Sequence, residues 1–172
     1  MRNKFIAFIS STLLAVLCTA ALVANAAEKR DQSYVKSNYR TMYKTAVSVG
    51  VSPNREVVQE ASTADMKYSH PDFKTKDEWA FVHSDLIDGA GTQTGYFIDT
   101  HEDGSQTFGV FKGTVKNTSK ADGSWESVWE GTYEYRGGSG KYKNIKGSGK
   151  YKGKASSQDP SGREEGWEKI EY

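Results

Sequence analysis

The sequence has little cysteine, little proline and no excess of either charge. Its 172 residues include one Cys, Cys18, and three Pro. The 23 Lys and Arg residues nearly balance the 22 Asp and Glu residues, so no global basic excess indicates a nucleic-acid partner. The Gly-x-Ser-x-Gly and His-Glu-x-x-His patterns of common hydrolases are also absent. We therefore expect no nucleic-acid partner and no cofactor.

Helical periodicity is missing as well. No segment beyond residue 38 carries a long apolar stripe at helical spacing, although residues 55–64 also fit one short helix. Short alternating segments are instead separated by turn residues such as Asp-Gly and Gly-Gly, which is typical of an antiparallel barrel or sandwich. We predict an all-β fold, an antiparallel closed β-barrel of about eight strands. The expected strands are residues 39–49, 56–68, 78–87, 94–100, 106–116, 124–135, 148–155 and 165–171.

The N-terminus has the pattern of a secretory signal. Arg2 and Lys4 precede an apolar run over residues 5–23, and Ala24-Asn25-Ala26 follows it. Small residues three and one before a cut suit the signal peptidase, so we predict cleavage between Ala26 and Ala27 and a secreted or periplasmic location. An uncleaved anchor is the alternative, but after cleavage we expect no stable membrane insertion.

Three segments follow from this cleavage. Residues 1–26 are the expected signal peptide, residues 27–38 a polar, flexible leader, and residues 39–172 the barrel domain. Because Cys18 would leave with the signal, the exported chain would have no disulfide. Its stability must then come from a packed core.

Aromatic residues are abundant and alternate along the expected strands. Over residues 125–135, Trp125, Trp129, Tyr133 and Tyr135 share one face and three glutamates share the other, which indicates one buried face and one solvated face. A barrel lined by rings either holds one small molecule or is filled by its own side chains. The predicted lining residues are Trp79, Phe81, His83, Tyr96, Ile98, Phe111, Trp129 and Tyr133.

A Gly-Ser-Gly-Lys-Tyr-Lys sequence occurs twice, at residues 138–143 and 147–152. The glycine spacing does not fit a phosphate-binding loop. In an extended chain Lys150, Lys152 and Lys154 share one face and Tyr151 lies on the other. This pattern favours a solvated outer surface over a core residue, with contact to anionic partners as the alternative.

The segment over residues 134–149 resembles a late signature of allene oxide cyclase-like and dirigent-like barrels. The matching residues are Gly137, Gly138, Gly140, Tyr142, Ile145 and Gly147. The resemblance implies an eight-stranded antiparallel barrel with an apolar cavity, often assembled as a trimer, so we expect a homo-oligomer. The Pro-free signal and the lack of disulfides favour an exported bacterial member. It transfers no catalytic residue, because no local motif places those groups in this chain.

Two His–Asp pairs are candidates for chemistry. His83 and Asp85 share a face of one expected strand, and Asp99 and His101 share a face of the next. Together they could form a metal site or an acid–base pair, although alternation makes such spacing common and surface roles are the alternative. We expect no metal.

Three functional hypotheses follow. The first is an exported barrel that binds a small apolar or aromatic molecule. The second is a cyclase or isomerase that uses the same cavity, with His83 or Asp85 taking part. The third is a filled, non-catalytic barrel that meets its partners through its surface.

Overall fold

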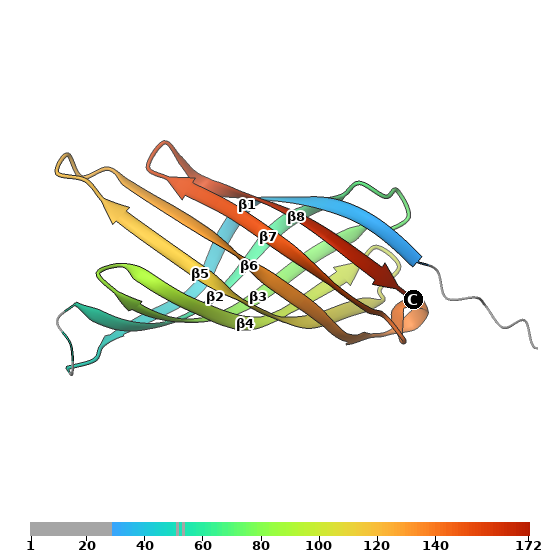
Figure 1. The fold of residues 1–172 in the computed structure, drawn as a ribbon. Helices are drawn as coiled ribbons and strands as arrows, with labels where there is room; N and C mark the ends of the chain where they lie inside the picture. Colours follow the sequence, from blue (N-terminus) through green and yellow to red (C-terminus); the bar gives the residue numbers. More distant parts are fainter. Residues whose placement is uncertain (1–28, 51, 53) are drawn as a thin grey trace, which may run out of the picture.

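Eight antiparallel strands close into a barrel in the computed structural model, which describes residues 29–172 except 51 and 53 (Figure 1). Each strand pairs with its neighbour in sequence, and β8 returns to pair with β1. The predicted fold class is therefore confirmed. The strands are β1 (Lys29–Ser48), β2 (Arg55–Tyr68), β3 (Thr75–Ile87), β4 (Ala90–His101), β5 (Gln106–Ser119), β6 (Trp125–Gly138), β7 (Lys146–Ser156) and β8 (Asp159–Glu171), with the short 3-10 helix η1 (Gly140–Tyr142) between β6 and β7.

The first strand corrects the prediction of a flexible leader over residues 27–38, as far as its described residues 29–38 are concerned. β1 begins at Lys29 and pairs with β8 as far as Ser37. The stretch lacks an apolar face because its inward side chains, which include Gln32 and Lys36, meet polar partners inside the barrel. The predicted signal peptide and the cut between Ala26 and Ala27 lie outside the described residues. Within the described residues, no helix is long and apolar enough to cross a membrane.

One end of the barrel is closed by packed side chains. Here η1, the β2–β3 connection and the C-terminus lie together (Figure 1). Phe73 is 1% exposed and Tyr142 is fully buried, with their ring centroids 4.9 Å apart. Ile145 and Ile170 pack into the same cluster. We call this the closed end, and the end that carries the β1–β2, β3–β4, β5–β6 and β7–β8 turns the open end.

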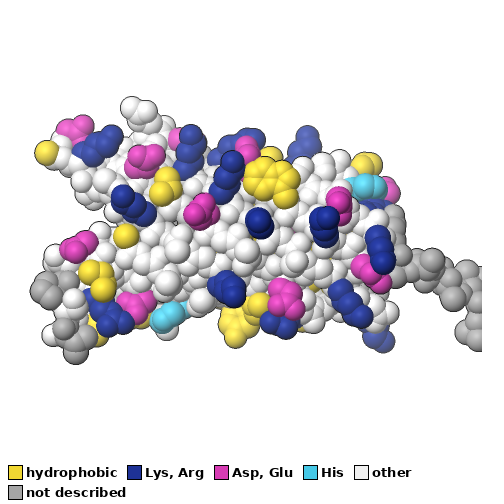
Figure 2. Space-filling view, viewed as in Figure 1, with side chains coloured by type: hydrophobic (Ala, Val, Ile, Leu, Met, Phe, Trp, Pro, Cys, Tyr) yellow, Lys and Arg dark blue, Asp and Glu magenta, His cyan; other side chains and the backbone are white. Residues whose placement is uncertain are grey.

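The glycine–lysine strand has the orientation that alternation predicts. Tyr151 is buried, while Lys150, Lys152 and Lys154 are exposed on the outer face of β7. The register places Lys152 between Glu130 of β6 and Glu165 of β8. Figure 2 shows basic and acidic side chains interspersed over the visible face. The lysines therefore form a solvated outer surface.

Candidate functional site

The barrel is hollow in its open half. A cavity of about 530 Å³ lies inside it, lined by side chains from all eight strands. The space-filling view shows a notch in the molecule at this end (Figure 2). Rings from β1, β2, β4 and β6 fill the interior on the side of the closed end. The apolar wall of the cavity includes Val58, Ala80, Val82, Leu86, Phe111, Val115 and Trp129.

Three of the eight residues predicted to line the interior do so. Phe111, Trp129 and Tyr133 come from β5 and β6 and all border the cavity. Tyr133 is 7% exposed, and the indole of Trp129 packs against Tyr39 with ring centroids 5.7 Å apart. Together with Trp125 of β6, these three residues make up four of the eight aromatic side chains that the described residues bring to the cavity.

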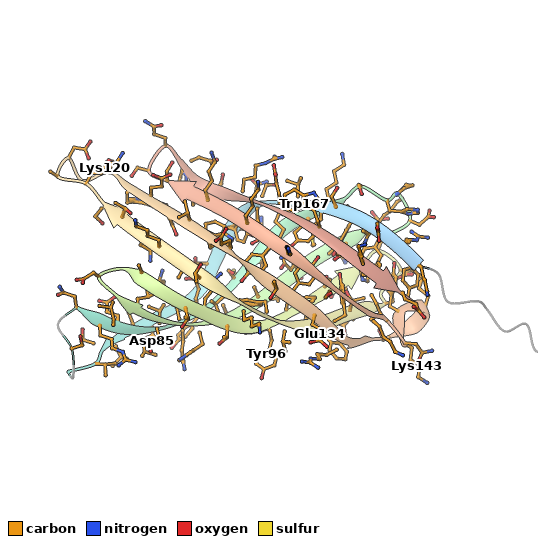
Figure 3. The ribbon with its side chains drawn as sticks, viewed as in Figure 1. Asp85, Tyr96, Lys120, Glu134, Lys143 and Trp167 are labelled. Carbon is orange, nitrogen blue, oxygen red and sulfur yellow. The ribbon has the colours of Figure 1, made fainter. Side chains whose placement is uncertain are left out.

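The other five predicted residues lie on the outer face, which corrects their assignment to the interior. Trp79, Phe81 and His83 of β3 alternate with inward side chains. Tyr96 of β4 is 65% exposed and projects away from the wall (Figure 3). Ile98 shares its face, since residues two apart on a strand point to the same side. The inward side chains of β3 are Glu78, Ala80, Val82, Ser84 and Leu86.

Packing inside the barrel explains this reversal. Gly95 of β4 faces inward, and a Cβ atom there would lie 2.5 Å from the ring of Phe111. The Phe111 ring therefore occupies the space that a side chain on this part of β4 would need. Since Gly95 faces inward, its neighbour Tyr96 must face outward.

The two His–Asp pairs lie on opposite sides of the wall, so they form no joint metal or acid–base site. Asp85 points outward, where the Arg55 guanidinium donates to its two oxygens over 2.9 and 2.5 Å. Asp99 and His101 are buried at 1% exposure each. Among residues 29–172, apart from 51 and 53, no group of three His, Cys, Asp or Glu side chains could hold a metal ion.

A buried lysine lies at the inner limit of the cavity. The Lys36 ammonium donates to Glu78 and lies 3.3 Å from Glu164. The side chains of these residues are 13%, 2% and 7% exposed. A buried charge needs a partner of opposite sign. Burial alone would lower the pKa of Lys36, but the attraction of Glu164 and Glu78 outweighs it and raises this pKa, so Lys36 remains an ammonium.

The two carboxylates that share Lys36 differ in their other partners. Glu164 accepts hydrogen bonds from Trp129 Nε1 at 2.7 Å and from the Tyr34 hydroxyl at 3.1 Å. For Glu78, Lys36 is the one hydrogen-bond donor that the described residues supply. Burial raises the pKa of Glu78 even though Lys36 opposes this. Glu78 thus borders the cavity with acceptor capacity to spare.

A second set of buried carboxyl groups lies deeper, toward the closed end. Glu168 accepts hydrogen bonds from Gln32 at 2.5 Å, from Tyr135 at 3.0 Å and from Tyr133. Asp99 accepts one from Thr107 at 3.2 Å. Burial raises the pKa of both carboxyl groups. Among the residues that the structure describes, the interior therefore holds more carboxyl groups than cations.

The sequence alone did not identify Lys36, Glu78 or Glu164 as interior residues. Lys36 falls in the expected leader, Glu78 alternates with the predicted lining residue Trp79, and Glu164 precedes the last expected strand. One signal was present, because Gln32, Tyr34 and Lys36 alternate in the same way as Glu164, Gly166 and Glu168. Polar residues at every second position are also typical of a solvated face, so the pattern alone does not identify an interior.

Replacing Asp99 with Asn is expected to change how stability depends on pH. The raised pKa means that folded protein keeps this proton where unfolded protein, with an ordinary pKa near 3.8, has lost it. The stability contributed by wild-type Asp99 therefore falls as pH rises through the folded pKa, by up to about 1.4 kcal/mol per pH unit. The Asp99→Asn variant lacks this slope. Its free energy of unfolding should therefore rise relative to that of the wild type from pH 5 to pH 8, which urea unfolding would measure.

Asp85→Asn is the matched control for this experiment. The hydrogen bond from Arg55 lowers the pKa of Asp85 below 3.8, so its titration lies outside the range from pH 5 to pH 8. Equal pH slopes in wild type and Asp99→Asn would contradict the burial argument.

Comparison with known proteins identifies no relative of this chain. A scan of protein-family models, a search of curated proteins and a search of solved structures each find no match. The functional argument therefore rests on the cavity and the residues that border it.

Proposed function

We propose that this protein binds one small molecule with an apolar or aromatic body in the open half of the barrel. The observation that carries the proposal is the cavity of about 530 Å³, with an apolar wall that ends at a buried charged group. Ligand sites in proteins commonly measure about 300–1,000 Å³ and combine apolar walls with a few placed polar groups. The cavity has both properties.

Two sequence patterns that do not involve the cavity also support the proposal. The resemblance of residues 134–149 to allene oxide cyclase-like and dirigent-like barrels suggests a fold that holds apolar molecules. The N-terminal signal pattern suggests that binding takes place after export. Membership of that family and export are both parts of the proposal.

A cyclase or isomerase reaction in the same cavity is the second candidate. Glu78 favours it, because a carboxyl group with a raised pKa beside an ammonium suits proton transfer. This candidate requires that a bound molecule is converted, which mass spectrometry of the recovered ligand would detect. His83 and Asp85 take no part, because they lie outside the barrel.

A fluorescent probe tests the binding function. N-phenyl-1-naphthylamine is neutral, apolar and brighter away from water, so it should bind wild type and gain fluorescence. Ala80 borders the cavity, and Ala80→Trp would place an indole in the hollow. We expect this variant to weaken probe binding at least about tenfold, equivalent to about 1.4 kcal/mol, while circular dichroism shows a folded barrel.

Ala61→Trp is the matched control, because Ala61 pairs with the outward residues Tyr43 and Phe81. The same ring added there should leave probe binding unchanged. Equal binding by wild type and Ala80→Trp would place the probe elsewhere and contradict the proposal.

A further inference from the structure

We infer that the cavity selects an organic cation, a molecule whose apolar body ends in an ammonium group that contacts Glu78. This inference rests on the proposed binding function and names the class of ligand that the same cavity takes. Three observations lead to it: the balance of charge around the cavity, the free acceptor capacity of Glu78 and the aromatic wall beside it.

The charges that border the cavity leave an excess of carboxylate. Near the mouth, Lys44 and Glu60 form an ion pair over 3.2 Å and neutralise each other. Deeper in, Lys36 is the single cation that the described part of the chain places against Glu78 and Glu164. One of these two carboxylates is therefore left without a compensating charge, and an anionic ligand would add to the excess.

Glu78 is the carboxylate that a ligand can reach. Glu164 already accepts hydrogen bonds from Tyr34 and Trp129 as well as facing Lys36. Glu78 is 2% exposed, borders the cavity and receives one donor from the described residues. A carboxylate has about four acceptor positions. A ligand ammonium would fill one with a hydrogen bond in which the donor and the acceptor are both charged.

The aromatic wall suits the same ligand. Trp129, Tyr39 and Phe111 all border the cavity, and Trp129 meets Tyr39 edge to face. Cations are attracted to the faces of such rings. The protein already uses this contact nearby, since Lys36 Nζ lies 5.2 Å from the ring centroid of Tyr34. Ring faces and a carboxylate together favour an ammonium over a hydroxyl or a carboxylate.

Three compounds with one body test the inference. 4-Phenylbutylamine, 4-phenylbutan-1-ol and 4-phenylbutanoate differ only in their polar end, and each is titrated into full-length folded protein by calorimetry at pH 7. We expect the amine to bind about tenfold more tightly than the alcohol, and the carboxylate to bind most weakly. In Glu78→Gln the amine and the alcohol should bind within about threefold of each other.

Glu130→Gln, on the outer face of β6, removes the same charge and should leave the preference for amine intact. If the alcohol or the carboxylate binds wild type as tightly as the amine, the inference is wrong while the proposed binding function stands. If none of the three binds and none displaces N-phenyl-1-naphthylamine, the inference fails, and the Ala80→Trp experiment decides the binding function separately. If Glu78→Gln still prefers the amine, the inference that Glu78 binds the ammonium group is also wrong.

Discussion

Lys36→Met lowers the free energy of unfolding by about 3–5 kcal/mol at pH 7, which is the expected cost of leaving buried charges without their partner. Methionine keeps much of the length of lysine but supplies no charge and no donor. Glu78 and Glu164 would then face each other across the barrel interior with no cation between them. Urea unfolding followed by circular dichroism measures the loss.

The loss should shrink in acid and on removal of the carboxylates. At pH 4 Glu78 of the variant takes up a proton more readily, because the attraction of Lys36 no longer lowers its pKa. The triple variant Lys36→Met, Glu78→Gln and Glu164→Gln should recover most of the stability, since neutral groups remain where charges were.

Lys150→Met is the matched control for this series. It makes the same substitution on the exposed outer face of β7, where changes usually stay within about 0.5 kcal/mol. Equal losses from Lys36→Met and Lys150→Met would show that the buried ion group contributes nothing to stability.

These variants also separate stability from binding. A binding site commonly retains groups that a maximally stable core would replace with apolar side chains. If the triple variant is as stable as wild type but no longer prefers the amine, then Lys36, Glu78 and Glu164 contribute to ligand binding and not to the stability of the fold. The barrel would then keep Lys36 mainly to hold Glu78 in its charged form.

The number of strands and most of their positions could be predicted from the sequence. Turn residues at Asp88-Gly89 and Asp103-Gly104 mark connections that the structure places between β3 and β4 and between β4 and β5. In β6, four rings on one face identify the inward side correctly, because glutamates occupy the other face. Local sequence is sufficient where one face is clearly apolar and the other clearly charged.

The faces of β3 and β4 could not be predicted in the same way. Both faces of β3 carry large apolar side chains, with Trp79 and Phe81 on one and Val82 and Leu86 on the other. Alternation shows that two faces exist but not which one turns inward. The choice depends on a residue of another strand, since Phe111 of β5 occupies the space in front of Gly95.

The charged group at the inner limit of the cavity depends on contacts between distant segments. Lys36 meets Glu78 and Glu164 only when β1 pairs with both β2 and β8. No spacing along the chain indicates this meeting. A lysine in a polar stretch is predicted to be solvated, and only the closure of the barrel places Lys36 inside.

Phe73→Ala is the second substitution with a large expected effect, because the Phe73 ring packs against three other rings of the closed end. Its ring is 1% exposed and meets Tyr68, His101 and Tyr142 with centroids 4.4 to 4.9 Å apart. Removing a fully buried Phe ring costs about 3–5 kcal/mol through lost burial and the space left behind. Thermal and urea unfolding should both show the loss.

Phe108→Ala makes the same substitution on the outer face of β5, where the ring is 42% exposed, and should cost at most about 1 kcal/mol. The cavity lies in the open half of the barrel, away from Phe73. The Phe73→Ala variant should therefore still bind N-phenyl-1-naphthylamine at temperatures where it stays folded. Loss of probe binding by folded Phe73→Ala would mean that the two halves are coupled and that packing at the closed end shapes the cavity. A loss below about 1 kcal/mol would instead mean that the side chains around Phe73 relax to fill its space, and that the closed end tolerates repacking.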